Sequence, residues 1–492
     1  METKKENPDP RPARPSLLRN WMSLIGLVTV IGALFSFFQL FILDTVGHFS
    51  NPYISILTWM VVPAFLVLGL VLTVVGELRE RRRRKGGVSL ISMVQVDLSR
   101  PRDRRNMAIF LSGAVLFLLL SAIGSYNSYQ FTESVQFCGE TCHTVMKPEL
   151  TAHALGPHAR VACAECHIGP GASWFVRSKL SGSYQVYAVL FDKYPRPIPT
   201  PIANLRPARE TCEQCHWPNQ FIGNLDQTTH YFLSDPSNTP YSIRMTLKVG
   251  GSDPLRGAVG GIHWHTSASN RVEYAAADPA RQKIVWVRMT DAQGVVTVFK
   301  TKNFTNDVPK DEIRTMDCID CHNRPSHRFM SPDSAVALAM DLGQIPRDLP
   351  WIKTNAVFAL TRKYNTDSEA REGIATALAD HYSGNPRIQQ VIPVVQRIYA
   401  DNFFPEMKSD WKAYPNNIGH LMWPGCFRCH DGNHKSVEGK VITASCDACH
   451  SILAQGSGAE LLQLTPGGQP FKHPGGDLGG ENSCNECHDG TL

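Results

Sequence analysis

Cysteine and histidine recur in this 492-residue chain in one fixed arrangement. All 14 cysteines fall into pairs, and in every pair the second cysteine is followed directly by a histidine. Six pairs have two residues between the cysteines: CAECH (163–167), CEQCH (212–216), CIDCH (318–322), CFRCH (426–430), CDACH (446–450) and CNECH (484–488). The first pair in the chain, CGETCH (138–143), has three intervening residues.

The histidine after each pair decides between three kinds of cysteine chemistry. Zinc sites use paired cysteines but give no reason for a histidine after every pair, and a disulfide framework ignores the histidines as well. Covalent haem attachment uses all three residues, because the cysteines form thioethers and the histidine ligates the iron. The sequence therefore predicts seven haem c groups. The attachment cysteines are Cys138, Cys142, Cys163, Cys166, Cys212, Cys215, Cys318, Cys321, Cys426, Cys429, Cys446, Cys449, Cys484 and Cys487, and the motif ligands are His143, His167, His216, His322, His430, His450 and His488.

Each haem iron takes a second axial ligand, and the remaining histidines are the natural candidates. Of 18 histidines, the motifs use seven, and ten of the others follow the first site, enough for six bis-histidine haems. In GGIHWHT (260–266), His263 and His265 would face one side of a strand, so at most one would ligate a given iron. The candidate distal ligands are His158, His230, His263, His327, His420, His434 and His473.

The first site differs from the others. His143 and Met146 are three residues apart, so on a helical turn they share one face and are alternatives for one side of the iron. The extra residue between Cys138 and Cys142 shifts His143 relative to the ring and favours Met146. The alternative is that His143 ligates and Met146 only packs on the haem.

Long apolar runs precede the haem sites. The runs 21–43, 54–76 and 107–126 each approach the ~20 residues that cross a bilayer. Lysine and arginine are concentrated before the first run and in the loop 77–106, whereas the loop 45–53 has none. The amino terminus and the basic loop should therefore be cytoplasmic and the haem region periplasmic, on the outer face of a bacterial inner membrane. The run ELRERRRRKGG (77–87) suits topology and membrane lipid, so no nucleic-acid partner is expected.

The expected fold is mainly α and membrane-anchored, with three transmembrane helices, a multihaem domain with little regular structure and a small β-rich insertion. KIVWVRMTDAQGVVTVFKTK (283–302) predicts a hairpin and YSIRMTLKVGG (241–251) a strand. Helices are expected in 366–382, which opens with a capping box, and in 386–404. The expected segments are 1–20 (cytoplasmic), 21–126 (membrane anchor), 127–216 (haems 1–3), 217–317 (β-rich insertion), 318–332 (haem 4), 333–425 (helical connector) and 426–492 (haems 5–7).

Three of these features resemble the NapC/NirT family of multihaem quinol dehydrogenases. A membrane span is followed closely by a first haem site with a methionine three residues after its histidine. The stretches PHARVACAECHIGPGASWFVRSKLSG (157–182) and CIDCHNRPSH (318–327) are also similar. With seven haems and three spans, the chain most resembles the ImcH-like inner-membrane cytochromes of metal-respiring bacteria.

The resemblance implies oxidation of a membrane quinol, such as menaquinol, at haem 1, with electrons exported to periplasmic c-type cytochromes or other acceptors. It implies Met146 as a haem 1 ligand, Lys179 at the quinol pocket, His158 as distal ligand of a later haem, the fourth, and His327 as that of the second. It also implies pairing of chains into an oligomer, and anaerobic or extracellular metal respiration.

The chain departs from that family at two places. Its first site has the extra residue, and the acidic residue expected about two turns after Lys179 is missing, because Gln185, Val186 and Tyr187 stand there. His48, in the outer loop between the first two spans, is a candidate proton acceptor in its place; the alternative is a plain loop histidine.

Two other functions remain open. The chain could be a passive wire and membrane anchor for a separate catalytic subunit. It could also be a terminal reductase of a small oxyanion, which needs an open iron in a polar pocket, although the CxxCK haem site of nitrite-reducing multihaem enzymes is absent from the sequence.

Overall fold

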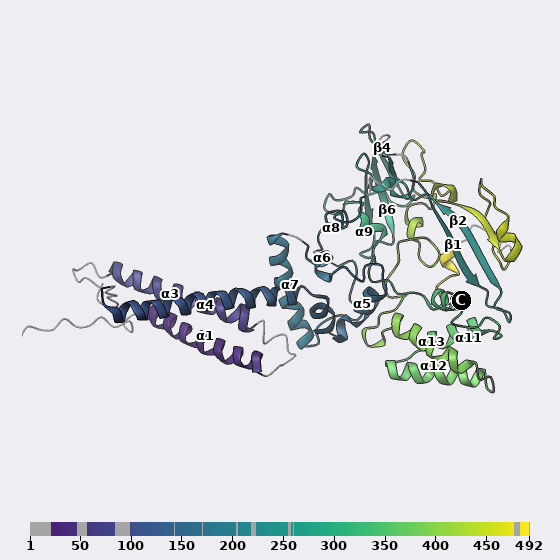
Figure 1. Cartoon of the computed structure of the whole chain (residues 1–492). Coiled ribbons are helices and arrows are strands. Elements are labelled where there is room, and N and C mark those ends of the chain that lie inside the picture. The colour runs from purple at the N-terminus through teal and green to yellow at the C-terminus, as the bar shows by residue number, and fades with distance from the viewer. Residues whose placement is uncertain are drawn as a thin grey trace, which may run out of the picture. The chain divides into compact units, whose positions relative to one another are not determined.

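A computed structural model describes residues 21–46, 57–83, 99–141, 143–169, 171–202, 205–217, 223–253, 257–258, 260–476 and 483–491. The chain divides into two compact units, Met1–Thr141 and Cys142–Leu492 (Figure 1). Two predicted site residues, His48 and Cys142, lie outside the described residues.

The first unit is helical. Among its described helices, the segments Trp21–Ile42 and Val62–Arg79 are long and apolar enough to cross a membrane. A third helix covers the apolar run 107–126, and whether it also crosses a membrane stays a prediction. The helical elements are α1 (Trp21–Val46), the π-turn η2 (Leu57–Val61), α3 (Val62–Arg83), α4 (Pro101–Thr132) and the π-turn η3 (Phe137–Thr141).

Glycines let α1 and α3 approach each other closely. A Cβ atom added to Gly26 would lie 2.5 Å from the backbone nitrogen of Thr73, and one added to Gly76 would lie 2.6 Å from Ser23 Oγ. Small residues at such crossings are typical of helices that pack in a bilayer, where close backbone approach replaces the hydrophobic driving force.

The second unit begins with short helices around the second and third haem sites. Both the histidine and the methionine of the first site lie on α5, as the helical-turn argument expected. The helices are α5 (His143–Leu155), α6 (Cys163–His167), α7 (Ala172–Leu190) and α8 (Ala208–Cys212).

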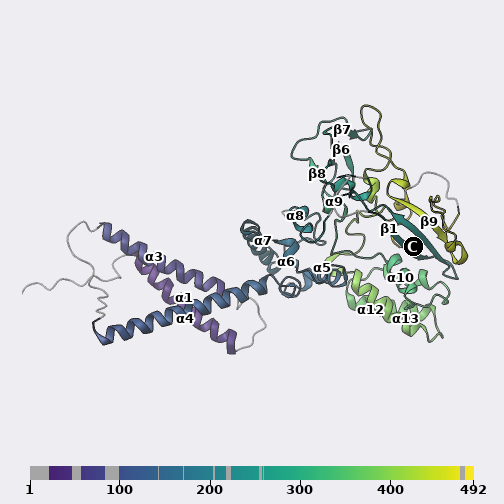
Figure 2. The ribbon, with the colours of Figure 1, turned by 45° about the horizontal axis from the view of Figure 1, so that its top comes forward.

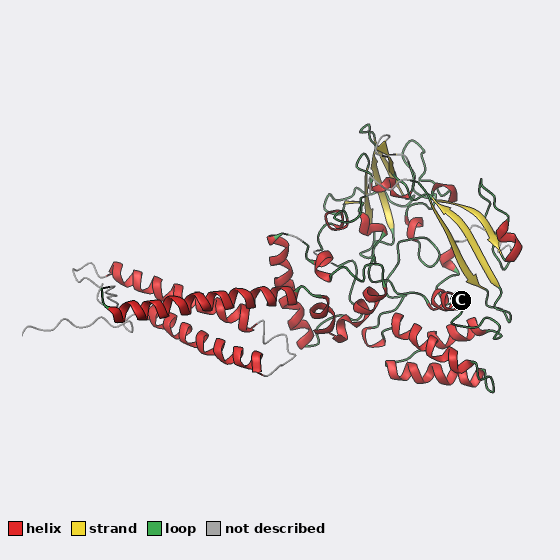
Figure 3. Ribbon diagram, in the orientation of Figure 1, coloured by secondary structure: helices red, strands yellow, loops and turns green. Residues whose placement is uncertain are grey.

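Three antiparallel sheets follow among the described residues, with strands shown as yellow arrows in Figure 3. Their strand orders are β1-β2-β9, β3-β4 and β7-β6-β5-β8. The strands are β1 (Leu225–Phe232), β2 (Pro240–Leu247), β3 (Ser252–Asp253), β4 (Gly257–Ala258), β5 (Arg271–Ala276), β6 (Ile284–Thr290), β7 (Val296–Lys300), β8 (Arg314–Thr315) and β9 (His450–Gly456).

The predicted hairpin and strand are both confirmed. β6 pairs with β7 in the register Trp286↔Lys300, and β2 occupies the run expected to be extended. The β-rich region is not self-contained, however. β2 also pairs with β9, which comes from the segment of the last three haem sites (Figure 2).

A helical layer without haem motifs carries the largest apolar core. The expected helices in 366–382 and 386–404 are confirmed as α12 and α13, which pack together (Figure 1). Thr366 caps α12 by accepting a hydrogen bond from the Glu369 backbone at 3.2 Å. Ile345, Ile374 and Val395 are each 0% exposed in this core. The helices of this layer are α10 (Pro332–Asp341), α11 (Ile352–Thr361), α12 (Asp367–His381) and α13 (Ile388–Asn402). The short helix α9 (Cys318–Cys321) precedes them and belongs to the fourth haem motif.

The last three haem sites lie among loops, as predicted. Apart from β9, the regular elements described there are short 3-10 turns: η7 (Gly425–Arg428), η8 (Cys446–Ala448), η9 (Gly458–Leu462) and η10 (Cys484–Glu486). The protein is a mixed helix and sheet structure, in which the β-rich part extends beyond the insertion that the sequence predicted. The strand-forming region recruits β9 from the C-terminal segment, a long-range pairing that local sequence patterns do not reveal.

Candidate haem-binding sites

The regular attachment motifs form tight turns. In four of them the backbone N–H of the motif histidine donates to the carbonyl of the first cysteine, at 2.8 Å for His216 and His322, 3.1 Å for His430 and 2.9 Å for His488. This hydrogen bond closes the turn and keeps the three residues that would hold one haem close together.

Each motif histidine from the second to the seventh site faces one histidine from elsewhere in the chain. Six pairs of imidazole rings result, and every pair contains one motif histidine. The ring-centre distances are 6.2 Å for His167–His327, 6.1 Å for His216–His158, 6.2 Å for His322–His263, 5.8 Å for His430–His265, 6.1 Å for His450–His420 and 6.0 Å for His488–His473.

These distances fit two axial ligands of one iron. An imidazole nitrogen bonds a metal at about 2.0 Å, and the ring centre lies about 1.15 Å further out, so opposite ligands place their ring centres about 6.3 Å apart. The observed range of 5.8 to 6.2 Å is close to this value. The residues present therefore fit bis-histidine haem at six sites.

Hydrogen bonds orient four of the non-motif histidines for ligation. Their Nδ1 atoms contact backbone carbonyls, which only accept, so the proton is on Nδ1 and the Nε2 lone pair is available to a metal. The contacts are His158 to Pro325 (3.2 Å), His263 to Val249 (2.5 Å), His265 to Ile262 (2.7 Å) and His327 to Glu149 (3.1 Å). His473 is different, since its Nδ1 accepts from the Gly475 N–H, and ligation through Nε2 requires that contact to be lost.

Burial keeps several of these imidazoles neutral, the form that binds metals. Desolvation lowers the pKa of His167, His265 and His322 below the usual value. Burial, with a contribution from the Arg324 guanidinium, lowers the pKa of His327 to about 4. The Glu149 carboxylate lies 3.2 Å from both Arg324 and His327 Nδ1, and burial raises its pKa.

Two histidines and one structural element differ from the sequence-based expectations. His158 faces His216 of the third site, and not the fourth. His265 faces His430 and is missing from the predicted set. The strand expected for His263 and His265 is a 3-10 turn, η5 (Ile262–Thr266), in which residues two apart point in different directions, so the two histidines serve different motif histidines.

Two predicted distal ligands have other partners. His434, 1% exposed, has both ring nitrogens in hydrogen bonds, to Asp431 Oδ1 at 3.0 Å and to the Ile284 carbonyl at 3.1 Å. His230 lies exposed on β1, with Nδ1 2.7 Å from Ser242 Oγ. Within the described residues neither ring pairs with a motif histidine, so the structure gives no support to either residue as a distal ligand. His434 has the contacts of a structural histidine.

The first site is only partly described. Met146 is half-buried on α5, one turn after His143, whose side chain lies outside the described atoms. The ligands of this haem stay predictions.

The other six sites follow one another in space in the order of the sequence. Cys166 of the second site lies close to Cys212 of the third, and Cys212 in turn lies close to Cys318 of the fourth. Cys321 of the fourth site is close in the same way to Cys426 of the fifth.

The contacts continue to the end of the chain. Phe427 of the fifth motif stacks on His420, with ring centres 4.3 Å apart, and His420 faces the sixth motif. Cys484 Sγ of the seventh motif lies 3.6 Å from His420 Nδ1. The second to seventh sites therefore form one continuous series.

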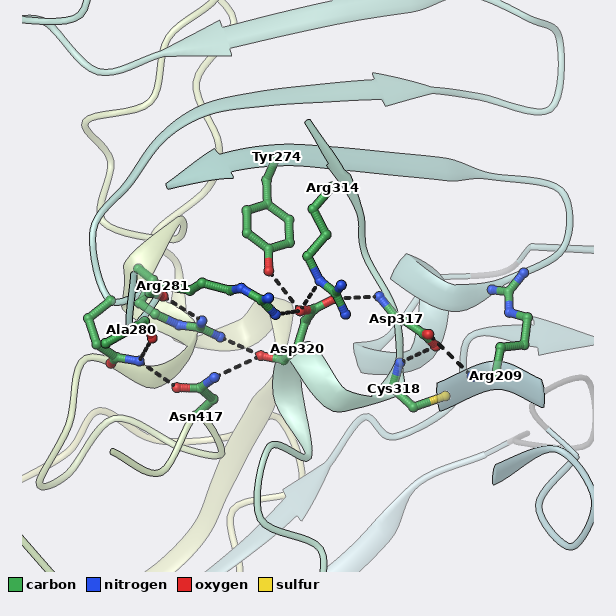
Figure 4. A network of polar contacts seen from close by, with 11 residues as sticks. Arg209, Tyr274, Ala280, Arg281, Arg314, Asp317, Cys318, Asp320 and Asn417 are labelled. Carbon is green, nitrogen blue, oxygen red and sulfur yellow. Dashed lines mark hydrogen bonds and ion pairs between the residues drawn. The ribbon is translucent and has the colours of Figure 1, made fainter. Parts of the chain in front are cut away.

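A buried carboxylate joins the fourth site to the sheet β7-β6-β5-β8 (Figure 4). Asp320, within the fourth motif and 3% exposed, accepts hydrogen bonds from Arg314 Nε, Tyr274 Oη and the Asp317 backbone, each at 2.7 Å. Arg281 lies 3.5 Å from the same carboxylate. Burial and this carboxylate raise the pKa of Tyr274, so its hydroxyl remains a donor.

α7 carries Lys179 and an exposed apolar stripe. The Lys179 ammonium lies over the Phe175 ring, 4.9 Å from its centre. Val176, Leu180 and Tyr184, at 54, 69 and 66% exposure, repeat every four residues and so share one face of the helix. Such a face, beside basic residues, is typical of a helix at a membrane surface.

Comparison with known proteins gives one informative relative. No protein-family model matches the chain, and no solved structure matches it. The chain is 40% identical over 487 residues to the cytochrome c-type protein ImcH of Geobacter sulfurreducens, covering 96% of this chain and 95% of that protein. Such a relative implies covalently bound haem c and a role in electron transfer. Together with the haem motifs, this similarity shows that the chain belongs to the ImcH family of cytochrome c-type proteins.

Proposed function

We propose that the protein is an inner-membrane quinol dehydrogenase, which oxidises a membrane quinol near its first haem and passes electrons along seven haem c groups to periplasmic acceptors. The observation that carries the conduction part is the set of six histidine pairs, each with one motif member and each spaced for one iron. The haems supply reversible one-electron carriers.

Histidines on both sides of six irons favour conduction over catalysis at those sites. An iron with two strong protein ligands has no open position for a substrate, which argues against reduction of an oxyanion at the second to seventh sites. The first site, with Met146 and His143 as alternatives for one side, is the one left for a distinct role, and we place quinol oxidation there.

Quinol oxidation releases two electrons and two protons, and the haems take only the electrons. The protons therefore need side-chain or water acceptors near the first site. Lys179, which the family resemblance places at the quinol pocket, is the first candidate for holding the quinol oxygen, and His48 is a candidate proton acceptor. The apolar stripe of α7 beside Lys179 supports contact of this region with the membrane, where quinols reside.

The membrane topology of the proposal rests on charge. The two candidate spans α1 and α3 are followed by the basic loop 77–106, which the positive-inside rule assigns to the cytoplasm. With a third crossing by α4, the haem sites lie in the periplasm, where covalent haem attachment takes place. Periplasmic c-type cytochromes are then the natural acceptors, as in anaerobic or extracellular metal respiration.

Stopped-flow reduction of the oxidised, detergent-solubilised protein by a menaquinol analogue tests this function. We expect Lys179→Ala and Met146→Ala to slow haem reduction by quinol, with haem content and reduction by dithionite unchanged. Lys310→Ala, at an exposed lysine in the loop between β7 and β8, is the matched control.

The passive-wire alternative makes a different prediction. If the electrons come from a separate subunit, the parent protein stays oxidised with quinol and the Lys179 and Met146 substitutions change nothing.

A further inference from the structure

The turn η5 (Ile262–Thr266) is held rigidly against the segment that precedes it. The Ile262 N–H donates to the Lys248 carbonyl at 2.8 Å and the His263 N–H to the Gly250 carbonyl at 3.1 Å. Gly261 has φ +108°, and an added Cβ would lie 2.3 Å from the Gly250 oxygen. An added Cβ on Gly251 would lie 2.2 Å from the His263 carbonyl carbon. Glycine is therefore required on both sides of the contact.

Two histidines of this single turn face two different attachment motifs. The His263 ring lies 6.2 Å from that of His322 in the fourth motif, and the ring planes are 7° apart. The His265 ring lies 5.8 Å from that of His430 in the fifth motif, and those planes are 84° apart. Trp264 between them packs against the apolar cluster of β5 and β6, which anchors the turn to the sheet.

The two motifs are also tied to each other directly. Arg428, between the cysteines of the fifth motif, donates to the Asp320 carbonyl of the fourth at 2.8 Å and to the Arg281 carbonyl at 3.0 Å. Asn417 donates to the same Asp320 carbonyl at 3.0 Å (Figure 4). The side chain of Asp320 is meanwhile held by Arg314 and Tyr274, so both faces of the fourth motif are fixed.

We propose that the turn η5 supplies the distal ligands of the fourth and fifth haems together, and that this makes them a rigid pair. The pair joins the part of the chain that resembles NapC/NirT proteins, which ends at the fourth site, to the C-terminal three-haem segment. The inference deepens the proposed electron-transfer function and rests on it. An electron crossing the pair oxidises the iron of the fourth site and reduces that of the fifth, and needs no proton or other reactant.

The two ring geometries give the pair a spectroscopic signature. In a low-spin ferric haem, parallel imidazole planes separate the energies of two iron d orbitals and give a rhombic electron paramagnetic resonance (EPR) spectrum. Perpendicular planes leave these orbitals nearly degenerate and give a highly anisotropic spectrum with a large maximal g value. The fourth haem should be of the first type and the fifth of the second.

The test is EPR of the oxidised full-length protein, without quinol, in His263→Met and His265→Met variants. We expect His263→Met to remove one haem's worth of rhombic signal and His265→Met one haem's worth of highly anisotropic signal. Each variant should also raise the reduction potential of one haem in seven, because a His/Met haem has a higher potential than a bis-histidine haem. His230→Met, on an exposed strand position, should change neither spectrum nor potentials.

Two results would overturn the proposal: both substitutions altering the same haem, or neither altering any. If a variant fails to assemble, the parent spectrum still decides. The ring planes of His216–His158 (75°) and His430–His265 (84°) together predict two haems' worth of highly anisotropic low-spin signal, and a parent with one or none contradicts the pairing of His265 with His430. Since no quinol is used, a negative result in the quinol assay leaves this test unaffected. Failure of the proposed function is thereby distinguished from failure of the paired ligation.

Discussion

Replacing Asp320 with asparagine tests the network that joins the fourth haem site to its sheet. The substitution keeps the side-chain shape but removes the charge that pairs with Arg314 at 2.7 Å and Arg281 at 3.5 Å. It also replaces one acceptor oxygen with an NH2 group, which faces the donors of Tyr274, Arg314 or the Asp317 backbone.

The expected cost follows from these contacts. A hydrogen bond to a charged group contributes about 1.5–3 kcal/mol to the free energy of unfolding. Of the three 2.7 Å hydrogen bonds that Asp320 accepts, roughly half are lost in the asparagine variant. Breaking a buried pair costs about 3–5 kcal/mol when the remaining charge stays buried. Arg281 and Arg314 have side chains 31 and 34% exposed and regain some hydration, which reduces the cost. We therefore expect a loss of about 3 kcal/mol.

Thermal unfolding of the purified protein, followed by circular dichroism and by haem absorbance, measures this loss. A change of about 3 kcal/mol should lower Tm by about 5–10 °C. Asp311→Asn, at an exposed position, is the matched control and should change the stability by less than about 0.5 kcal/mol. If Asp320→Asn unfolds at the same temperature as the parent and the control, the network does not hold the fourth site as described.

Three further predictions concern other parts of the chain. Ile374→Ala, at a 0% exposed position of the helical core, should cost about 3 kcal/mol in chemical denaturation, whereas Phe358→Ala, at 63% exposure, should cost far less. The Glu273 carboxylate lies 2.7 Å from Arg288 Nε and 2.9 Å from Arg271 Nη2. The hydrogen bond from Arg288 is the main cause of the lowered pKa of Glu273. Because the pKa of Glu273 is lower in the folded protein, the carboxylate stabilises the fold above pH 4.5, and this contribution is lost as the pH falls through the folded-state pKa. Glu273→Gln should therefore reduce the free energy of unfolding by ~1 kcal/mol at pH 7 and by less after acidification through that range. Gly26→Leu should disrupt the contact of α1 with α3, because a Cβ atom at this position would lie 2.5 Å from the backbone nitrogen of Thr73. The disruption is measured as a loss of folded protein that resists detergent.

The sequence was sufficient for the local features of the haem sites. Covalent attachment depends on residues within five or six positions of one another, so the seven motifs could be read directly. Local periodicity likewise predicted the hairpin of β6 and β7 and the helix α12, whose cap at Thr366 is set by neighbours in the chain.

The partners of the motif histidines depend on tertiary structure and could not be read in the same way. His265 is absent from the predicted ligands because the pattern around it favours a strand, although two consecutive glycines before it, Gly260 and Gly261, signal a tight turn. Charge and spacing also gave no means of separating His434, whose two nitrogens bond within the protein, from a true ligand. The β9 strand was missed for the related reason that its partner lies about 200 residues earlier, and long-range pairing leaves no local pattern.

Quinol oxidation is tested most directly by the extent and rate of haem reduction when the oxidised protein is mixed with a reduced menaquinol analogue in a stopped-flow instrument. If the protein oxidises quinol, reduction is rapid, spreads over the series of haems and is blocked by a quinone-site inhibitor. Haems that stay oxidised with quinol, yet reduce readily with dithionite, would contradict this activity and would make the protein a wire that receives its electrons from another subunit.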